Sequence, residues 1–140
     1  MADSAFLDTN VVVYAFDDDE PVKQHHAREI LAAVDGPMLV VSTQVLAEFY
    51  VTVTEKLARP LDADSARRAV AELAQLPVVS VDADVVLAAI DLATRHQLSF
   101  WDAQIVQAAV TAGCSSILTE DLSDGAMLGG IRVENPFAAL

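Results

Sequence analysis

Short apolar runs alternate with longer segments of helical periodicity, and this alternation constrains the fold more than any other feature of the sequence. The apolar runs fall at residues 5–7, 38–41, 78–81, 116–119 and 131–133. Strands separated by helices favour right-handed crossover connections and a parallel sheet with helices on both faces. The sequence therefore predicts one α/β domain over residues 1–140, with three α/β/α layers and a central, Rossmann-like parallel sheet of about five strands.

The intervening segments carry the apolar stripes of amphipathic helices. The predicted inward-facing residues are Ala27, Ile30, Leu31 and Val34; Val45, Phe49, Val53 and Leu57; Ala66, Val70, Leu73 and Leu76; and Trp101, Ile105, Ala108, Ala109 and Ala112. Residues 62–65 have the composition of a helix N-cap, and Asp82 and Ser99 are each placed to cap a further helix. We therefore expect helices between all consecutive strands except the last two.

Composition excludes several classes of protein. The chain has 140 residues, of which 54% are apolar, so it can bury a core. Its 21 acidic and 8 basic residues give a net charge of -13, which excludes a basic DNA-binding module. The lone Cys114 excludes an intrachain disulfide and a cysteine-based zinc site. Neither a signal peptide nor a membrane-spanning segment is visible, so we expect a cytoplasmic protein without a membrane partner.

Two acidic residues follow predicted strands directly. Asp8 follows the first strand and Asp121 follows the strand at residues 116–119. Sites in open parallel sheets form beyond the carboxyl ends of the strands, so these carboxylates converge if the two strands are neighbours. Carboxylates held together repel one another unless a proton or cation lies between them, and oxygen ligands suit Mg²⁺ or Mn²⁺. This pattern predicts a divalent metal site.

Each acidic residue also has a purely structural interpretation. Asp8 is suited to an Asx turn, and Asp121 to a solvated turn. Asp102 lies three residues after Ser99, close to a capping box. Helical periodicity places Glu48 away from the apolar stripe of its helix and so predicts that it faces solvent.

Four motifs taken together resemble the PIN domain family. They are Phe-Leu-Asp-Thr-Asn at residues 6–10, Glu48 before Phe49 in a helix, Trp-Asp-Ala at 101–103 opening a helix, and Thr-Glu-Asp at 119–121 ending a strand. Residues 7–16 and 99–125 match most specifically, whereas residues 57–98 match only in pattern. The chain resembles the small VapC-like PIN ribonucleases that act as toxins of type II toxin–antitoxin pairs.

The resemblance implies a role for each matching residue. Asp8, Glu48, Asp102 and Asp121 would be the catalytic acids that bind the metal, with Asp124 as an additional candidate ligand. Thr9, Asn10 and Thr119 would be supporting polar residues that orient the acids or contact substrate. Arg67, Arg68, Lys56 and Arg59 form the best candidate basic patch for RNA.

The activity implied is Mg²⁺- or Mn²⁺-dependent endoribonuclease cleavage, in which the metal lowers the pKa of water and neutralises charge on the phosphate. The implied partners are an RNA substrate, a cognate antitoxin protein and a second copy in a homodimer. An alternative is a catalytically silent PIN fold that serves as a protein-interaction module.

Two other families with an acidic residue after the first strand do not fit. Haloacid dehalogenase-type hydrolases need a second aspartate where this chain has Asn10. Response-regulator receiver domains need a lysine after their last strand, but the only lysines are Lys23 and Lys56.

Overall fold

The computed structural model describes residues 3–140, and its strands form one six-stranded sheet. The strands are β1 (Ser4–Leu7), β2 (Met38–Ser42), β3 (Val78–Val79), β4 (Ser116–Leu118), β5 (Met127–Leu128) and β6 (Ile131–Glu134). Their order is β3-β2-β1-β4-β6-β5, and every neighbouring pair is parallel except β5 with β6. The predicted parallel sheet is confirmed, with one short antiparallel strand added at its edge.

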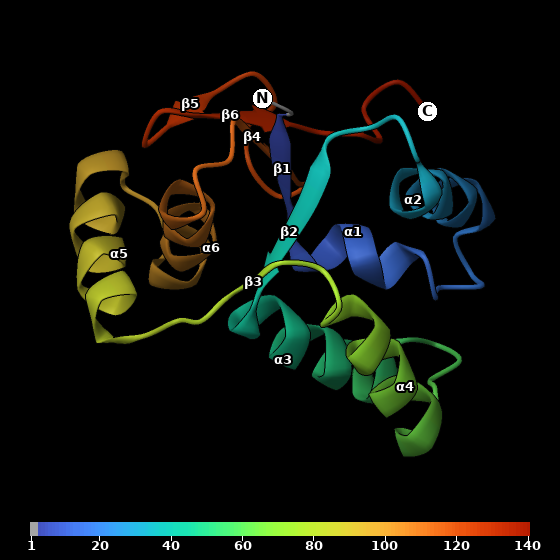
Figure 1. Cartoon of the computed structure of the whole chain (residues 1–140). Helices are drawn as coiled ribbons and strands as arrows, with labels where there is room; N and C mark the ends of the chain where they lie inside the picture. The colour runs from blue at the N-terminus through green and yellow to red at the C-terminus, as the bar shows by residue number, and fades with distance from the viewer. Residues whose placement is uncertain (1–2) are drawn as a thin grey trace.

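Helices cover both faces of the sheet, as the three-layer prediction requires. They are α1 (Thr9–Tyr14), α2 (Pro21–Ala32), α3 (Thr43–Val51), the π-helical segment η1 (Thr52–Lys56), α4 (Ala63–Leu73), α5 (Ala83–His96) and α6 (Phe100–Thr111). Figure 1 shows α5 and α6 on one side of the central strands, and α1 and α2 on the other. Among residues 3–140, no helix combines the length and apolar composition that a bilayer span requires.

The direction in which strands are added to the sheet reverses at β1, and this reversal positions the site. β1 leads outward through β2 to β3, and the chain then returns to add β4 on the other side of β1. The two strands are in parallel register, with Leu7 opposite Leu118, and the Asp8 N–H donates to the Leu118 carbonyl (3.0 Å). The residues after β1 and β4 are therefore neighbours at a topological switch point, where ligands bind in open α/β sheets.

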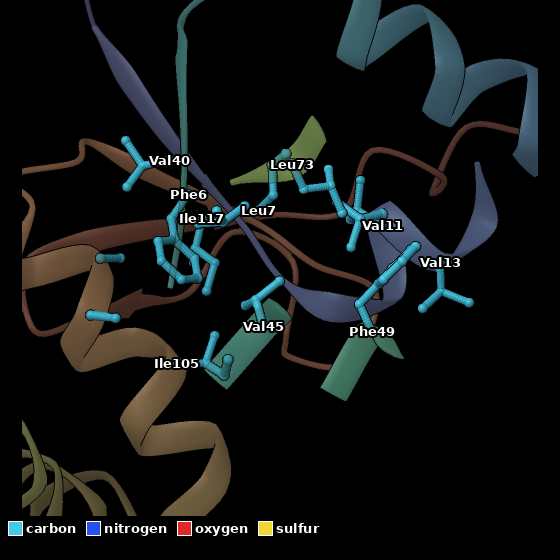
Figure 2. Close-up of a cluster of buried hydrophobic side chains, with 14 of the residues drawn as sticks. Phe6, Leu7, Val11, Val13, Val40, Val45, Phe49, Leu73, Ile105 and Ile117 are labelled. Carbon is cyan, nitrogen blue, oxygen red and sulfur yellow. The ribbon is translucent and has the colours of Figure 1, made fainter. Parts of the chain in front are cut away.

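The core lies between the sheet and its helices. Phe6, Leu7 and Ile117 from the central strands are fully buried, and Phe49 from α3 is fully buried with them. Figure 2 shows these side chains converging with Val11 of α1. Burial of large apolar side chains stabilises the fold by roughly 1.5–3 kcal/mol each, so this cluster fixes the elements that carry the polar residues beyond the strand ends.

Three predicted helix starts are confirmed by their caps. Asp62, Asp82 and Ser99 each accept a hydrogen bond from the backbone N–H three residues later, at 2.8, 3.0 and 3.1 Å. These caps satisfy N–H groups that a helix start leaves without partners.

Three predictions of buried helical residues are wrong. Val34 is 94% exposed because α2 ends at Ala32, before the predicted stripe is complete. Trp101 is 62% exposed because it lies at the first turn of α6, beyond the surface that packs on the sheet. Ala112 is exposed because it is already the C-cap of α6.

Candidate functional site

Four carboxylates from four different parts of the chain line one cavity of about 610 Å³, together with a fifth, Asp17. Asp8 follows β1, Glu48 lies on α3, Asp102 lies in the first turn of α6, and Asp121 follows β4. The cavity is open to solvent at the carboxyl ends of the central strands. The structure therefore brings together the four acidic residues that the sequence singled out.

Asp8 is the most buried of these acids, with 6% of its surface exposed. It is the N-cap of α1, where its Oδ1 accepts from the Thr9 N–H (2.7 Å), so the structural interpretation of Asp8 is correct as well. Burial raises the pKa of Asp8 from 3.8 to about 6, and the negative charges of Asp121 and Glu48 add to this rise. Hydrogen bonds from Thr119 and from the Thr9 N–H oppose it.

Thr119 and Asn10 connect Asp8 to Asp121. The fully buried Thr119 hydroxyl donates to Asp8 Oδ2 (2.8 Å) and accepts from the Asp121 N–H (3.1 Å). Asn10 Nδ2 donates to Asp121 Oδ2 (3.1 Å) and lies 3.3 Å from Thr119 Oγ1 and 3.4 Å from Asp8 Oδ2. These two uncharged side chains hold the carboxylates in fixed positions relative to each other.

Glu48 faces the cavity and is only partly exposed, so the prediction from periodicity that it faces solvent is wrong. Its Oε1 accepts from the Thr9 hydroxyl (2.9 Å) and its Oε2 accepts from Gln44 Nε2 (3.4 Å). Gln44 is in turn held by the buried Gln104 of α6, whose Nε2 donates to Gln44 Oε1 (2.8 Å). The sequence reasoning missed this glutamine pair, which ties Glu48 to the helix that carries Asp102.

Asp102 is partly exposed at the cavity. Its backbone N–H donates to the Ser99 hydroxyl (3.1 Å), which completes the N-cap of α6. A carboxylate in the first turn of a helix is stabilised by the helix dipole. The capping interpretation therefore accounts for the backbone of Asp102, while its side chain remains available at the cavity.

The donors at the cavity have the chemistry of a site for a hard divalent cation, since carboxylate oxygens predominate. Among residues 3–140, however, no three histidine, cysteine or acidic side chains lie close enough together to form a ready-made metal site. Hydrogen bonds to Thr9, Asn10, Gln44 and Thr119 instead occupy oxygens of Asp8, Glu48 and Asp121. The acids share the cavity without meeting at one point.

Several predicted site residues lie outside the cavity lining. Asp124 is exposed, and its Oδ1 accepts from the Asn135 N–H (2.9 Å). Arg59 pairs with Asp19 (2.9 Å), and Arg67 and Arg68 lie on the exposed face of α4. Only Lys56 of the predicted basic patch lines the cavity. The structure therefore does not gather these four basic residues beside the acids.

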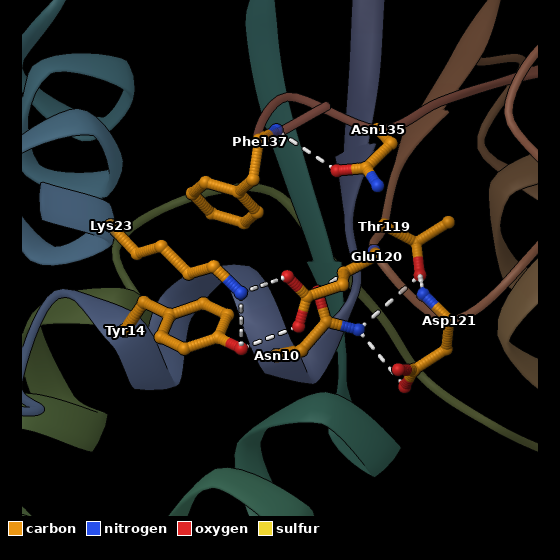
Figure 3. Close-up of polar contacts among 8 residues, drawn as sticks. All are labelled: Asn10, Tyr14, Lys23, Thr119, Glu120, Asp121, Asn135 and Phe137. Carbon is orange, nitrogen blue, oxygen red and sulfur yellow. Dashed lines mark hydrogen bonds and ion pairs between the residues drawn. The ribbon is translucent and has the colours of Figure 1, made fainter. Parts of the chain in front are cut away.

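A second polar cluster, not anticipated from the sequence, adjoins the cavity. Lys23 Nζ donates to Glu120 Oε2 (2.6 Å), and the Tyr14 hydroxyl donates to Glu120 Oε1. Partial burial alone would raise the pKa of Glu120, but these two hydrogen bonds and the Lys23 charge lower it below its usual range. Figure 3 shows Lys23 and Tyr14 on one side of Glu120, with Asn10 and Asp121 on the other.

A family profile described as the PIN domain matches residues 5–123 of this chain. Comparison with curated proteins finds no match. Solved structures with the same fold include Mycobacterium tuberculosis VapC20, described as a sarcin–ricin loop cleaving toxin (21% identity, TM-score 0.66, covering 84% of this chain and 89% of that one).

Two further similar structures come from complexes. A chain of a toxin–antitoxin complex from Klebsiella pneumoniae is 20% identical, with a TM-score of 0.71 and coverage of 95% of this chain and 98% of that one. A chain of VapBC2 from Rickettsia felis, bound to a DNA fragment from its promoter, is 18% identical, with a TM-score of 0.64 and coverage of 94% and 98%.

Proposed function

This chain belongs to the PIN domain family, and from that premise we propose that it is a divalent-metal-dependent endoribonuclease. The observation that carries the proposal is the cavity at the switch point, which Asp8, Glu48, Asp102 and Asp121 line together. Carboxylates of this kind bind the metal ions that assist phosphodiester hydrolysis.

The donors of the cavity fit Mg²⁺ or Mn²⁺, and the residues that would hold the cation are the four acids, with Asp124 a weaker candidate because it lies outside the lining. When bound, such a cation supplies a Lewis acid that polarises the phosphate and lowers the pKa of water.

The residues around the acids have supporting roles in this proposal. Thr9 donates to Glu48, Asn10 donates to Asp121, and Thr119 donates to Asp8, so three of the four carboxylates are oriented by uncharged neighbours. Lys56 supplies positive charge for a substrate phosphate at a lining whose other charged residues are all acidic.

We further propose that the chain is the toxin of a toxin–antitoxin pair of the VapC-like kind. Similar structures are described as a loop-cleaving toxin and as part of a toxin–antitoxin complex, and both are matched over most of their length. A cognate antitoxin would bind over the acidic cavity, where an arginine can pair with the carboxylates and take the place of a cation. A homodimer and a cytoplasmic location belong to the same proposal.

The test is cleavage of cellular RNA by the purified chain, freed of any partner, with Mg²⁺, Mn²⁺ or EDTA. Asp8→Asn removes one charge with little change of shape and should abolish cleavage while the protein stays folded by circular dichroism. Asp84→Asn, an exposed acid on α5, is the matched control and should cleave as wild type does.

The catalytically silent interaction module is the competing function, and the lack of a ready-made metal group in residues 3–140 favours it. It predicts no cleavage by wild type under any metal condition, no metal-dependent rise in the melting temperature, and equal partner binding by wild type and Asp8→Asn. Sequencing the 5′ ends of cellular RNAs after brief expression would identify the substrate if cleavage occurs.

A further inference from the structure

Glu120 lies between two residues of the acidic site, yet its own carboxylate is absent from the cavity lining. We propose that Lys23, Tyr14 and Glu120 form a positioning cluster that holds the Glu120 backbone in place and thereby orients Asn10 between the carboxylates of Asp8 and Asp121. The inference rests on the proposed function for its consequence in catalysis.

Both oxygens of the Glu120 carboxylate accept hydrogen bonds, from Lys23 and from Tyr14. Lys23 Nζ donates to one oxygen (2.6 Å) and the Tyr14 hydroxyl donates to the other, while Lys23 also contacts the Tyr14 hydroxyl (3.3 Å). Lys23 Nζ lies 4.8 Å from the Tyr14 ring centroid and 5.8 Å from that of Phe137. Two rings and two hydrogen bonds therefore restrain the ammonium that pairs with the Glu120 carboxylate (Figure 3).

The backbone of Glu120 acts on the opposite side. Its N–H donates to Asn10 Oδ1 (3.2 Å). A backbone N–H can only donate, so this bond requires the amide oxygen of Asn10 to face Glu120 and its Nδ2 to face the carboxylates. Nδ2 then donates to Asp121 Oδ2 (3.1 Å). The orientation of Asn10, on which the spacing of the two acids depends, is therefore set by the position of Glu120.

Global stability does not explain this cluster well. The side chains of Lys23 and Glu120 are 30% and 26% exposed, and ion pairs that open to solvent contribute roughly 0–1 kcal/mol. The ion pair matters more for local geometry than for global stability, because it joins α2 to the residues directly after β4. Loss of the pair should leave the fold intact and release the Asn10 amide.

The direction in which the Mn²⁺ affinity changes in two variants distinguishes a positioning role of the cluster from a simple effect of its charges. By charge alone, Lys23→Met makes the site more negative and should tighten Mn²⁺ binding, whereas Glu120→Gln should weaken it. Positioning predicts that both variants weaken Mn²⁺ binding about five- to tenfold by calorimetry. It also predicts that the double variant binds no more weakly than either single one, because both act through the same backbone.

The matched controls are Arg132→Met and Glu29→Gln, which remove the same charges at exposed positions outside the cluster. They should leave Mn²⁺ affinity within twofold of wild type. Lys23→Arg keeps the charge and the donors and should restore binding, while Tyr14→Phe, which removes one hydrogen bond, should have an intermediate effect.

A second readout needs neither metal nor activity. In ¹H–¹⁵N spectra, the Asn10 side-chain amide and the Glu120 backbone amide should shift in Lys23→Met and in Glu120→Gln, but not in either control. Unchanged Asn10 signals, or Mn²⁺ affinities that move in opposite directions in the two variants, would overturn the proposal. If wild type cleaves no RNA the proposed function fails, but these spectra still decide whether Glu120 orients Asn10.

Where wild type does cleave RNA, kcat at saturating Mn²⁺ should fall about tenfold in Lys23→Met with KM within twofold of wild type. A purely structural role would instead lower the melting temperature and leave kcat per folded molecule unchanged.

Discussion

Asp8 is a buried carboxylate with other acids nearby, and both conditions oppose its ionisation. It is 6% exposed and faces the charges of Glu48 and Asp121, so its pKa rises to about 6. The same carboxylate caps α1 and accepts from the Thr119 hydroxyl, so both of its oxygens are hydrogen-bonded. A group held in this way resists ionisation in the free protein and gains from any cation that binds beside it.

The pKa of Asp8 predicts how stability of the metal-free protein depends on pH. Its folded pKa is raised above the usual 3.8, so the folded state holds the proton more tightly than the unfolded state. The resulting stabilisation is complete below about pH 4 and is lost as the pH rises through about 6. Two units of pKa correspond to roughly 3 kcal/mol.

Asp8→Asn should remove this dependence. In EDTA, the free energy of unfolding of wild type relative to Asp8→Asn should fall by about 2.5 kcal/mol between pH 4 and pH 7.5, measured by urea denaturation. A difference between the two proteins that stays constant with pH would show that Asp8 ionises normally.

Thr119 predicts a second effect at a single residue, because its hydroxyl serves both Asp8 and the Asp121 N–H. Thr119→Val keeps the shape but leaves these groups unsatisfied, so the free energy of unfolding should fall by about 2 kcal/mol. The pKa of Asp8, followed by carboxyl ¹³C NMR in EDTA, should rise further, since the Thr119 hydrogen bond lowers it. Thr119→Ser keeps the hydroxyl and should leave this pKa close to that of wild type.

At the level of elements, the features predicted correctly are those that local sequence determines. Asp62, Asp82 and Ser99 cap helices because a short polar side chain can reach an N–H three residues on, whatever the tertiary fold. Apolar runs likewise locate five strands, because a short continuous apolar run is itself a local signal of a buried strand. In contrast, β5 has two residues and exists only because the turn after it folds it back onto β6.

Periodicity failed where the surroundings of a helix decide the outcome. Glu48 lies off the apolar stripe of α3, and a pattern of hydrophobicity cannot distinguish a polar cavity from solvent. Trp101 has a large apolar side chain typical of a core, but it lies in the first turn of α6, beyond the surface that packs on the sheet. The Gln44–Gln104 pair joins residues 60 positions apart, so no local signal predicts it.

The N-cap of α5 is formed by the side chain of Asp82. Asp82→Ala removes the acceptor for the Val85 N–H and should lower the free energy of unfolding by about 1 kcal/mol, measured in urea. Asp91→Ala removes an equal charge from the middle of the same helix, where no cap exists, and should change stability by less than about 0.5 kcal/mol. Equal losses in the two variants would mean that charge, and not capping, stabilises α5.

At the scale of the whole molecule, the net charge of -13 opposes any polyanion. The five acids that line the cavity account for only part of the 21 acidic residues, so neutralising them locally leaves a negative molecule. Binding of RNA to this surface must therefore depend on a bound cation and on the few basic groups placed at the cavity, instead of on the overall field.

This dependence can be measured with a labelled single-stranded RNA oligonucleotide by fluorescence anisotropy. Ca²⁺ should serve as a cation that supports binding with slow hydrolysis, and replacing it with EDTA at constant ionic strength should weaken binding at least tenfold. Lys56 lines the cavity whereas Arg67 lies exposed on α4, so Lys56→Met should weaken binding several-fold and Arg67→Met should not. Loss of one phosphate contact should also reduce the slope of log affinity against log salt by about 1. Equal effects of the two substitutions, or equal affinity with and without Ca²⁺, would place the RNA on a surface other than the acidic cavity.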